Sequence, residues 1–272
     1  MNLSMLEEIP PWEWPQDTDQ TLLSILNDSH AGETDRCLAA ALAGDFVVIN
    51  DALADKLLKI VQDSSETETM RGNAVISLGT ALEHADTMGF EDDQDILVSE
   101  EVFRRVQNAL HTLFMDKAVP EAVRGKILET SVRAPQKWHT EAVRTAYADK
   151  DPQWRLTALF CMRYVNGFDE QIVAALDSPN ADIQYQAVCA AGNWEVDAAW
   201  SHIAALVTAE QTEKTMLLAA IDASAKIRPQ EATVLLDDLM DDDDEEISDA
   251  VFEALTLAGM IESLDDEAEE GH

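Results

Sequence analysis

Two successive stretches of this chain repeat one another between Asp151 and Ala191, and this repetition limits the fold more than any other feature. Residues 151–158 read Asp-Pro-Gln-Trp-Arg-Leu-Thr-Ala, in which a turn opens a helix with an apolar residue, an arginine and an inward alanine. Residues 181–187 follow the same order, with Gln184 in place of the arginine. A chain that repeats a helical unit is expected to stack its units in series.

The inward small or apolar residue of this unit recurs along most of the chain. It is found at Ala39, Ala74, Ile127, Ala158, Ala187, Ala219 and Ala250, at intervals of 35, 53, 31, 29, 32 and 31 residues. A period near thirty with two helices per unit is typical of an α-solenoid, because one helix pair cannot bury its own apolar stripe. The sequence therefore predicts an all-α fold, an α-solenoid of about six to seven stacked antiparallel helix pairs. The interval of 53 marks an insertion.

Composition agrees with a helical core built from small and aliphatic residues. Hydrophobic residues make up 46% of the 272 residues but aromatic residues only 6%, so Ala, Leu, Val and Ile must fill the interior. Glycine numbers 10 and proline 8, which is few for a β-sandwich with its many turns. No segment alternates apolar and polar residues for long enough to predict a strand.

The net charge is −36, from 54 acidic and 18 basic residues. Such a chain repels nucleic-acid phosphates and anionic membrane surfaces, so neither is an expected partner. A basic protein or a cation is the more natural partner, and a basic protein is the one we expect. The alternative is that the acidity only serves solubility, or adapts the protein to a salt-rich or acid-tolerant cell.

The three cysteines, Cys37, Cys161 and Cys189, fall inside predicted helices and are interpreted as small buried hydrophobes in a reducing compartment. The first residues lack a basic segment followed by a long apolar run, and no stretch approaches the roughly 18 apolar residues of a membrane span. We therefore expect a cytoplasmic protein.

Three parts are predicted along the chain. Residues 1–16 form an extended segment in which prolines flank Trp12 and Trp14; these tryptophans either cap the apolar end of the first repeat or dock on a partner. Residues 17–260 form the repeat domain. Residues 261–272 form an acidic, disordered tail, and the acidic end of the chain is interpreted as a source of solubility that protects the end of the solenoid.

The insertion is placed at about residues 86–98. Its acids are Glu91, Asp92, Asp93 and Asp95. A calcium-binding EF-hand loop needs alternating acids, a central glycine and a closing glutamate, whereas Gly89 here precedes most of the acids. We expect an exposed acidic loop that ends at the helix cap Ser99, and no metal site.

The repeats resemble those of the HEAT-repeat family over residues 34–260. The opening helix of that family carries an Asp or Pro turn, then Val-Arg and an alanine three residues further on, which matches Val123-Arg124 and Trp154-Arg155 with Ala158. Gln184, Met216 and Ser248 depart from the pattern. Similar helical repeats serve as scaffolds and adaptors, as chromophore lyases and, in one branch, as DNA glycosylases. The resemblance implies a fold and a binding role, not a reaction.

No catalytic residue and no cofactor are predicted. The sequence has no His-Glu-x-x-His, no glycine-rich phosphate loop and no Gly-x-Ser-x-Gly. The six histidines are scattered over different repeats, at His30, His84, His111, His139, His202 and His272. The glycosylase branch fits least, because its substrate is a polyanion.

The turns between the two helices of each unit carry the residue types that are enriched at binding hot spots. Stacking is expected to place these turns along one edge, with the candidate partner-binding residues Arg133, Trp138, His139, Arg163, Tyr164, Asn193, Trp194 and Arg228. The alternative is structural. Cations stabilise helix C-termini, and aromatic rings fill the gaps between repeats.

These features predict a non-enzymatic scaffold or adaptor that binds a protein with a basic surface through its concave face and its turn edge. One alternative is a lyase-type or ligand-handling accessory enzyme that takes a small ligand in the groove. Another is a mimic of polyanions that inhibits a nucleic-acid-binding protein. The identity of the partner, the stoichiometry and the oligomeric state stay open.

Overall fold

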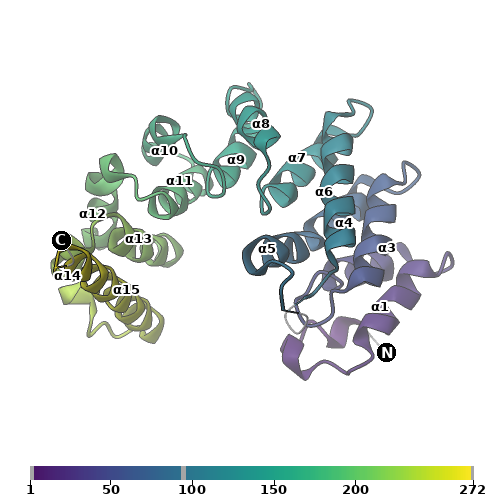
Figure 1. The fold of residues 1–272 in the computed structure, drawn as a ribbon, viewed down its shortest axis with the longest axis horizontal. Helices are drawn as coiled ribbons and strands as arrows, with labels where there is room; N and C mark the ends of the chain where they lie inside the picture. The colour runs from purple at the N-terminus through teal and green to yellow at the C-terminus, as the bar shows by residue number, and fades with distance from the viewer. Residues whose placement is uncertain (1–2, 93–95, 271–272) are drawn as a thin grey trace. The chain divides into compact units, whose positions relative to one another are not determined.

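The computed structural model describes residues 3–92 and 96–270, with residues 260–270 as backbone alone. Within these ranges every regular element is a helix and no strand is present, so the predicted all-helical repeat fold is confirmed (Figure 1). The chain divides into two compact units, Met1–His139 and Thr140–His272. The predicted boundaries at residues 16 and 260 stay predictions.

Unit 1 begins with two short 3₁₀ helices and continues with α-helices. The elements are η1 (Leu3–Met5), η2 (Pro11–Glu13), α1 (Thr18–Asn27), α2 (Glu33–Leu42), α3 (Asp51–Gln62), α4 (Glu68–Ser77), α5 (Gly79–Met88), α6 (Glu100–Met115) and α7 (Glu121–Ser131). Helix α8 (Lys137–Tyr147) runs across the boundary between the units.

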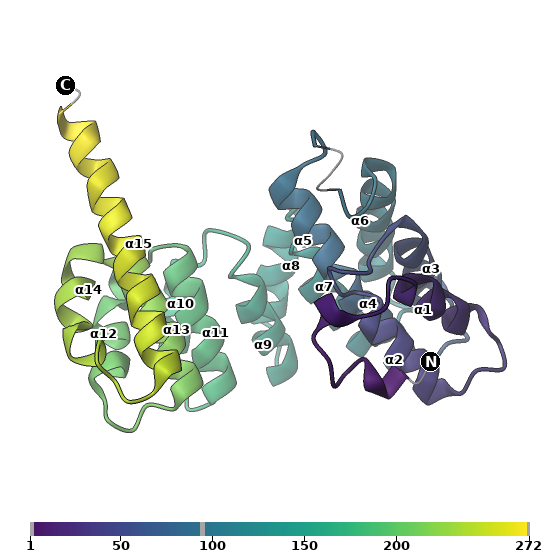
Figure 2. The ribbon, with the colours of Figure 1, turned by 90° about the horizontal axis from the view of Figure 1, so that it is seen from below.

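Unit 2 is built from helix pairs that follow one another with short connections. Its elements are α9 (Pro152–Cys161), α10 (Asp169–Leu176), α11 (Ala181–Asn193), η3 (Asp197–Ala199), α12 (Trp200–Thr208), α13 (Lys214–Ile227), α14 (Pro229–Leu235), η4 (Asp237–Leu239) and α15 (Glu245–Glu270). The first helices α9, α11, α13 and α15 pack successively against one another, and α10, α12 and α14 cover their other side (Figure 2).

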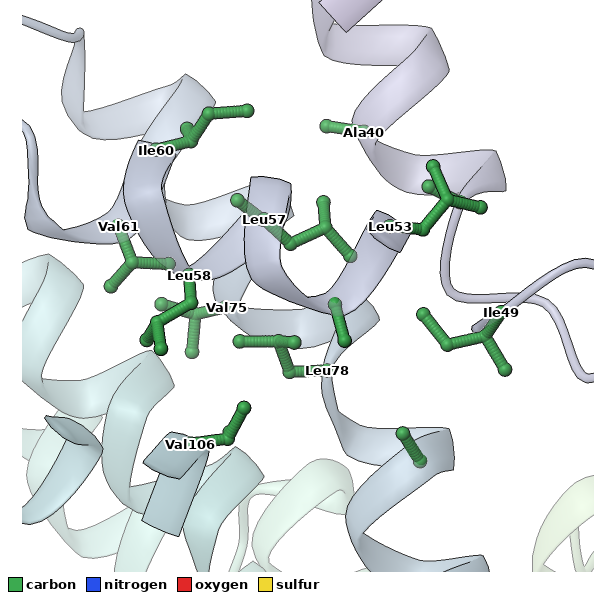
Figure 3. Close-up of a cluster of buried hydrophobic side chains, with 14 of the residues drawn as sticks. Ala40, Ile49, Leu53, Leu57, Leu58, Ile60, Val61, Val75, Leu78 and Val106 are labelled. Atoms are coloured by element: carbon green, nitrogen blue, oxygen red, sulfur yellow. The ribbon is translucent and has the colours of Figure 1, made fainter. Parts of the chain in front are cut away.

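The core of unit 1 lies between its two layers of helices. Helices α2, α4 and α7 form one layer, and α3 and α6 pack on it from the other side. Figure 3 shows aliphatic side chains from these helices meeting in the interior, among them Leu57, Val75, Leu78 and Val106. Each of these is almost completely buried, so their transfer from water supplies the main stabilisation of the stack.

The inward residue of each repeat is buried where the sequence places it, with two exceptions near the end. Ala39, Ala74, Ile127, Ala158 and Ala187 are each completely buried. In the last two repeats the buried position is one residue later, at Ala220 and Val251 instead of Ala219 and Ala250. Both neighbours are small or apolar, so spacing alone does not decide which of the two faces inward.

Several helices begin at side-chain caps that the turns supply. Asn50, Thr67, Ser99, Asp151 and Asn180 each accept a hydrogen bond from a backbone N–H in the first turn of the helix that follows. Such a bond satisfies a donor that the helix itself leaves unpaired. The cap predicted at Ser99 is confirmed, and its own N–H donates to Asp51 Oδ1 at 2.7 Å.

Two glycines allow successive first helices to approach closely. A Cβ atom on Gly44 would lie 2.5 Å from Ser77 Cα, and one on Gly192 would lie 2.9 Å from Ala223 Cα. At the first contact, Ser77 Oγ also donates a 2.7 Å hydrogen bond to the carbonyl of Ala40. The junction of α2 with α4 therefore depends on a missing side chain and on a hydroxyl that satisfies a helix-end carbonyl.

The long interval in the repeat contains a helix as well as a loop. Helix α5 begins at Gly79, directly after α4 ends, and α6 packs against α3 and α7 in the place of a second helix. Of the predicted insertion, residues 93–95 lie outside the described residues. The inserted material is therefore α5 together with the connection that leads to α6.

The last helix continues into the stretch that the sequence predicts as a disordered tail. Helix α15 includes the backbone of residues 261–270, a difference explained by the high helix propensity of its Glu and Ala residues. Residues 271 and 272 lie outside the described residues. None of the helices in the described ranges is long and apolar enough to cross a bilayer.

Candidate functional site at the turns of the first two helix pairs

The predicted turn residues of unit 1 are held by contacts inside that unit. Arg133 forms an ion pair with Glu83 on α5, and its side chain lies over Gly79, where a Cβ would come within 3.0 Å of Arg133 Cδ. Trp138 stacks with the rings of His111 and His139, whose centroids lie 4.8 and 3.8 Å away. These residues thus join α5, α6 and α8.

His139 is completely buried, so its side chain is not offered to a partner. Its Nδ1 accepts a 2.8 Å hydrogen bond from the N–H of Gln136, and its Nε2 lies 3.0 Å from Ser131 Oγ. Burial lowers the pKa of His139 from 6.5 to about 4. A neutral imidazole at neutral pH fits this site, because a charged ring would be desolvated.

The structure brings four predicted turn residues of unit 2 together. Asn193 Nδ2 donates to the carbonyl of Arg163 at 3.1 Å, and Trp194 Nε1 donates to the carbonyl of Met162 at 2.6 Å. Tyr164 follows Arg163 in the chain, with its ring 5.6 Å from that of Phe160. The end of α11 is therefore bonded to the end of α9.

Arg228 lies in the turn between α13 and α14. Its Nε donates to Asp197 Oδ1 at 2.8 Å, and its guanidinium lies 5.4 Å from the ring centroid of Trp200. The pKa of Asp197 is lowered by this hydrogen bond and by the charge of Arg228. This predicted residue also makes its contacts within unit 2.

A groove of about 600 Å³ lies at the same kind of turn, in the first two helix pairs. Three segments of unit 1 form it: the N-terminal segment, the α2–α3 turn and the junction of α4 with α5. The large residues among those that line it are Leu6, Ile9, Pro11, Trp14, Leu42, Phe46 and Ile76. In sequence register Ala39 corresponds to Ala74, so the two turns are equivalent positions of successive repeats.

The α2–α3 turn presents its apolar residues outward. Asp45 Oδ1 accepts a hydrogen bond from the N–H of Val47 at 2.9 Å, and the carbonyl of Asp45 accepts one from Val48. This local turn leaves Phe46 56% exposed, while Val48 and Ile49 enter the core. Ile76 on α4 is 51% exposed beside the same groove.

The N-terminal segment forms the other wall of the groove. It is not extended as predicted, because Leu3 and Leu6 are buried and draw the chain into short helical turns. Trp14 Nε1 donates to the carbonyl of Leu6 at 3.0 Å, and the indole packs against the core cluster of unit 1. Trp12, by contrast, is 77% exposed.

The surroundings of the groove are apolar and acidic. Met5, Trp12 and Val47 are further exposed large residues on the segments that form it, and Glu7 and Asp45 line it. No Lys or Arg precedes Arg36 in the sequence. Large exposed apolar patches are a common feature of interaction surfaces.

The sequence signal for this site is the run Phe46-Val47-Val48-Ile49. All four residues lie in the connection between α2 and α3, which cannot bury four consecutive apolar side chains, so some of them must face solvent. The sequence predicts the turn edge as the binding surface, but the candidate residues there belong to later repeats. What places Phe46 beside Ile76 and Ile9 is tertiary packing, which spacing does not report.

The described side chains offer no cluster of metal ligands. Among residues 3–92 and 96–259, no group of three or more His, Cys, Asp or Glu side chains could hold a metal ion. The groove itself offers apolar contacts, two carboxylates and two hydroxyls, from Ser77 and Thr80. This arrangement suits the burial of apolar side chains from a ligand.

No protein-family model matches the chain, and no curated protein sequence matches it. Among solved structures, it is similar to human deoxyhypusine hydroxylase in complex with glycerol, with 14% identity and a TM-score of 0.41, over 93% of both chains. It is also similar to YibA of E. coli, with 14% identity and a TM-score of 0.45, over 93% of this chain and 95% of that one. A third is an engineered protein, with 17% identity and a TM-score of 0.38, over 90% and 97%. Similarities at this level support no statement about activity.

Proposed function

We propose that this protein is a binding module that captures a protein partner in the groove of unit 1. The single observation that supports this proposal is the gathering of Ile9, Phe46 and Ile76 around one groove, each of them an exposed large apolar side chain. Such anchors are typical of the central part of an interface, where they fill or line pockets on the partner.

The partner segment is one that carries two or more large apolar side chains flanked by Lys or Arg. Apolar side chains match the walls of the groove, and basic flanks match Glu7 and Asp45 in its lining. The charge of the chain, −36, favours the approach of such a segment over any acidic one. This is the basic partner that the sequence predicts, and the proposal assigns it to the groove at this turn edge.

A selection from a library of random peptides tests this proposal with defined ligands. The expected peptides are rich in Leu, Ile, Phe or Trp with neighbouring Lys or Arg, and they lose binding to Phe46→Ser and to Ile76→Ser. Phe252→Ser is the matched control, because Phe252 on α15 is 72% exposed but belongs to unit 2. Selection of acidic or wholly polar peptides would overturn the proposal.

A further inference from the structure

Arg163 differs from most arginines of this chain in its charge environment. Six of the ten arginines in the sequence lie in ion-pair contact with a carboxylate, namely Arg36, Arg104, Arg105, Arg133, Arg144 and Arg228. Arg163 has no carboxylate within ion-pair distance in the part of the chain that the structure describes. In a protein with three acids for every base, a half-buried guanidinium that no acid neutralises needs a physical explanation.

The guanidinium is held in place by neutral groups of α9 and α11. Its carbon lies 5.6 Å from the ring centroid of Phe160, and Nη1 donates to Gln186 Oε1 over a long 3.4 Å. Its Nε is buried and has no hydrogen-bond partner. Tyr185 and Cys189 on α11 lie within electrostatic reach of the same charge. Within the described residues, the bond to Gln186 is the one that its Nη groups make to a side chain, which leaves the other Nη donors for water or a ligand.

We propose that Arg163, with Gln186 beside it, forms a binding site for a carboxylate. A guanidinium presents parallel N–H donors that fit the two oxygens of a carboxylate, and the nearby Phe160 ring attracts its positive charge. The Gln186 amide supplies further donors at the same place, whereas the Tyr185 hydroxyl is hydrogen-bonded to Cys189. The ligand is a carboxylate of a peptide, either a side chain or a chain end.

A monoanion fits this site better than a phosphate. Lys226 on α13 is a second cation whose charge reaches Cys189. Its Nζ forms an ion pair with Asp222 at 2.7 Å, so it does not add a free positive charge to the site. One guanidinium in a strongly acidic chain balances one negative charge, whereas phosphate sites are built from several cations or helix N-termini. The site lies in unit 2 and is independent of the groove in unit 1.

Nuclear magnetic resonance of the arginine side chains tests the site in the full chain. N-acetylglycine supplies a chain-end carboxylate, N-acetylglutamic acid α-amide supplies a side-chain carboxylate, and N-acetylglycinamide is the uncharged control. At constant ionic strength, at least one carboxylate is expected to shift the Arg163 Nε–H signal along a saturating curve. The amide is expected to leave it unchanged. A linear shift with both acids, or an equal shift with the amide, would overturn the proposal.

Two variants separate ligand binding from packing. Gln186→Glu places a carboxylate of the same shape against Arg163. The internal ion pair is expected to lower the affinity for the added acid by about tenfold or more. Arg163→Gln is expected to abolish the saturating response of the remaining signals of the cluster, with an unchanged helical circular dichroism spectrum. If Gln186→Glu binds the added acids as well as the unchanged protein does, Arg163 is not their site.

Discussion

The indole nitrogen of Trp194 donates a 2.6 Å hydrogen bond to the carbonyl of Met162, which lies 32 residues earlier in the chain. The bond joins the end of α11 to the end of α9, the first helices of two successive repeats. In unit 1 the Ser77 hydroxyl makes the equivalent connection from α4 to the Ala40 carbonyl of α2. A side chain that satisfies the preceding repeat's helix-end carbonyls is thus used more than once in this fold.

The first prediction concerns this junction. Trp194→Ala is expected to lower the free energy of unfolding by about 3 kcal/mol, because it empties a half-buried aromatic site. Trp194→Phe keeps most of the ring and loses the bond, so its expected cost is about 1 kcal/mol. Urea denaturation followed by circular dichroism measures both. Unchanged midpoints would instead favour the sequence-based expectation that Trp194 contacts a partner.

The second prediction concerns the close approach of α2 and α4. Gly44→Ala is expected to destabilise the protein by about 1 to 3 kcal/mol, because the added methyl group would overlap the backbone of Ser77. Gly125→Ala in the middle of α7 is the control, since a Cβ atom added there would have nothing within 4 Å. That change is expected to stabilise by about 0.5 to 1 kcal/mol. Equal effects of the two changes on thermal unfolding would contradict the contact.

The third prediction concerns the buried His139. Its pKa is about 4 in the folded protein and 6.5 when unperturbed, so the unfolded state binds the proton first as the pH falls. The neutral His139 ring makes its full contribution to the free energy of unfolding above pH 6.5. This contribution is lost progressively between pH 6.5 and pH 4. The expected loss is about 2 kcal/mol between pH 7 and pH 5.

The control for this prediction is the His139→Gln variant, because the loss of negative charge at low pH affects both proteins alike. The difference in unfolding free energy between the two proteins is expected to shrink as the pH falls from 7 to 5. Titration of the His139 ring signals by nuclear magnetic resonance checks the cause. A midpoint near 6.5 in the folded protein would refute it.

Much of the fold follows from the sequence because its signals are local and repeated. Ala39, Ala74 and Ala158 are buried as their spacing predicts, and Ser99 caps a helix as its position predicts. The slip from Ala219 to Ala220 cannot be predicted, because two adjacent alanines carry the same signal. The break at Leu78, where α4 gives way to α5, depends on packing against α6 and α7.

The sites are harder to predict, because a binding surface is defined by what packing leaves outside. Large residues in the later turns, such as Trp194 and Arg228, have the composition of a hot spot but are engaged by the neighbouring repeat. Phe46 and Ile76 are ordinary core residues by type, and only the folded chain shows that half of each remains exposed. Composition therefore indicates a turn edge without indicating which of its residues are exposed.

The fourth prediction concerns the salt dependence of partner binding at the groove. A selected peptide with Lys or Arg flanks is expected to bind unit 1 several-fold more weakly at physiological than at low ionic strength. Exposed charges are screened over about 8 to 10 Å, and the loss should appear mainly in the association rate. Stopped-flow measurement at two salt concentrations checks it. A rate that salt does not change would mean that the acids around the groove take no part.

The central claim is that apolar side chains at the turns of the first two helix pairs bind the partner. Its most direct test is a fluorescence anisotropy titration of one selected peptide with the unchanged protein, Ile76→Ser and Phe252→Ser. Ile76→Ser is expected to weaken binding by about tenfold, the effect of removing one interface anchor, with unchanged thermal stability. Phe252→Ser is expected to bind as the unchanged protein does. Equal affinities for all three proteins, or weakening by Phe252→Ser alone, would contradict the account.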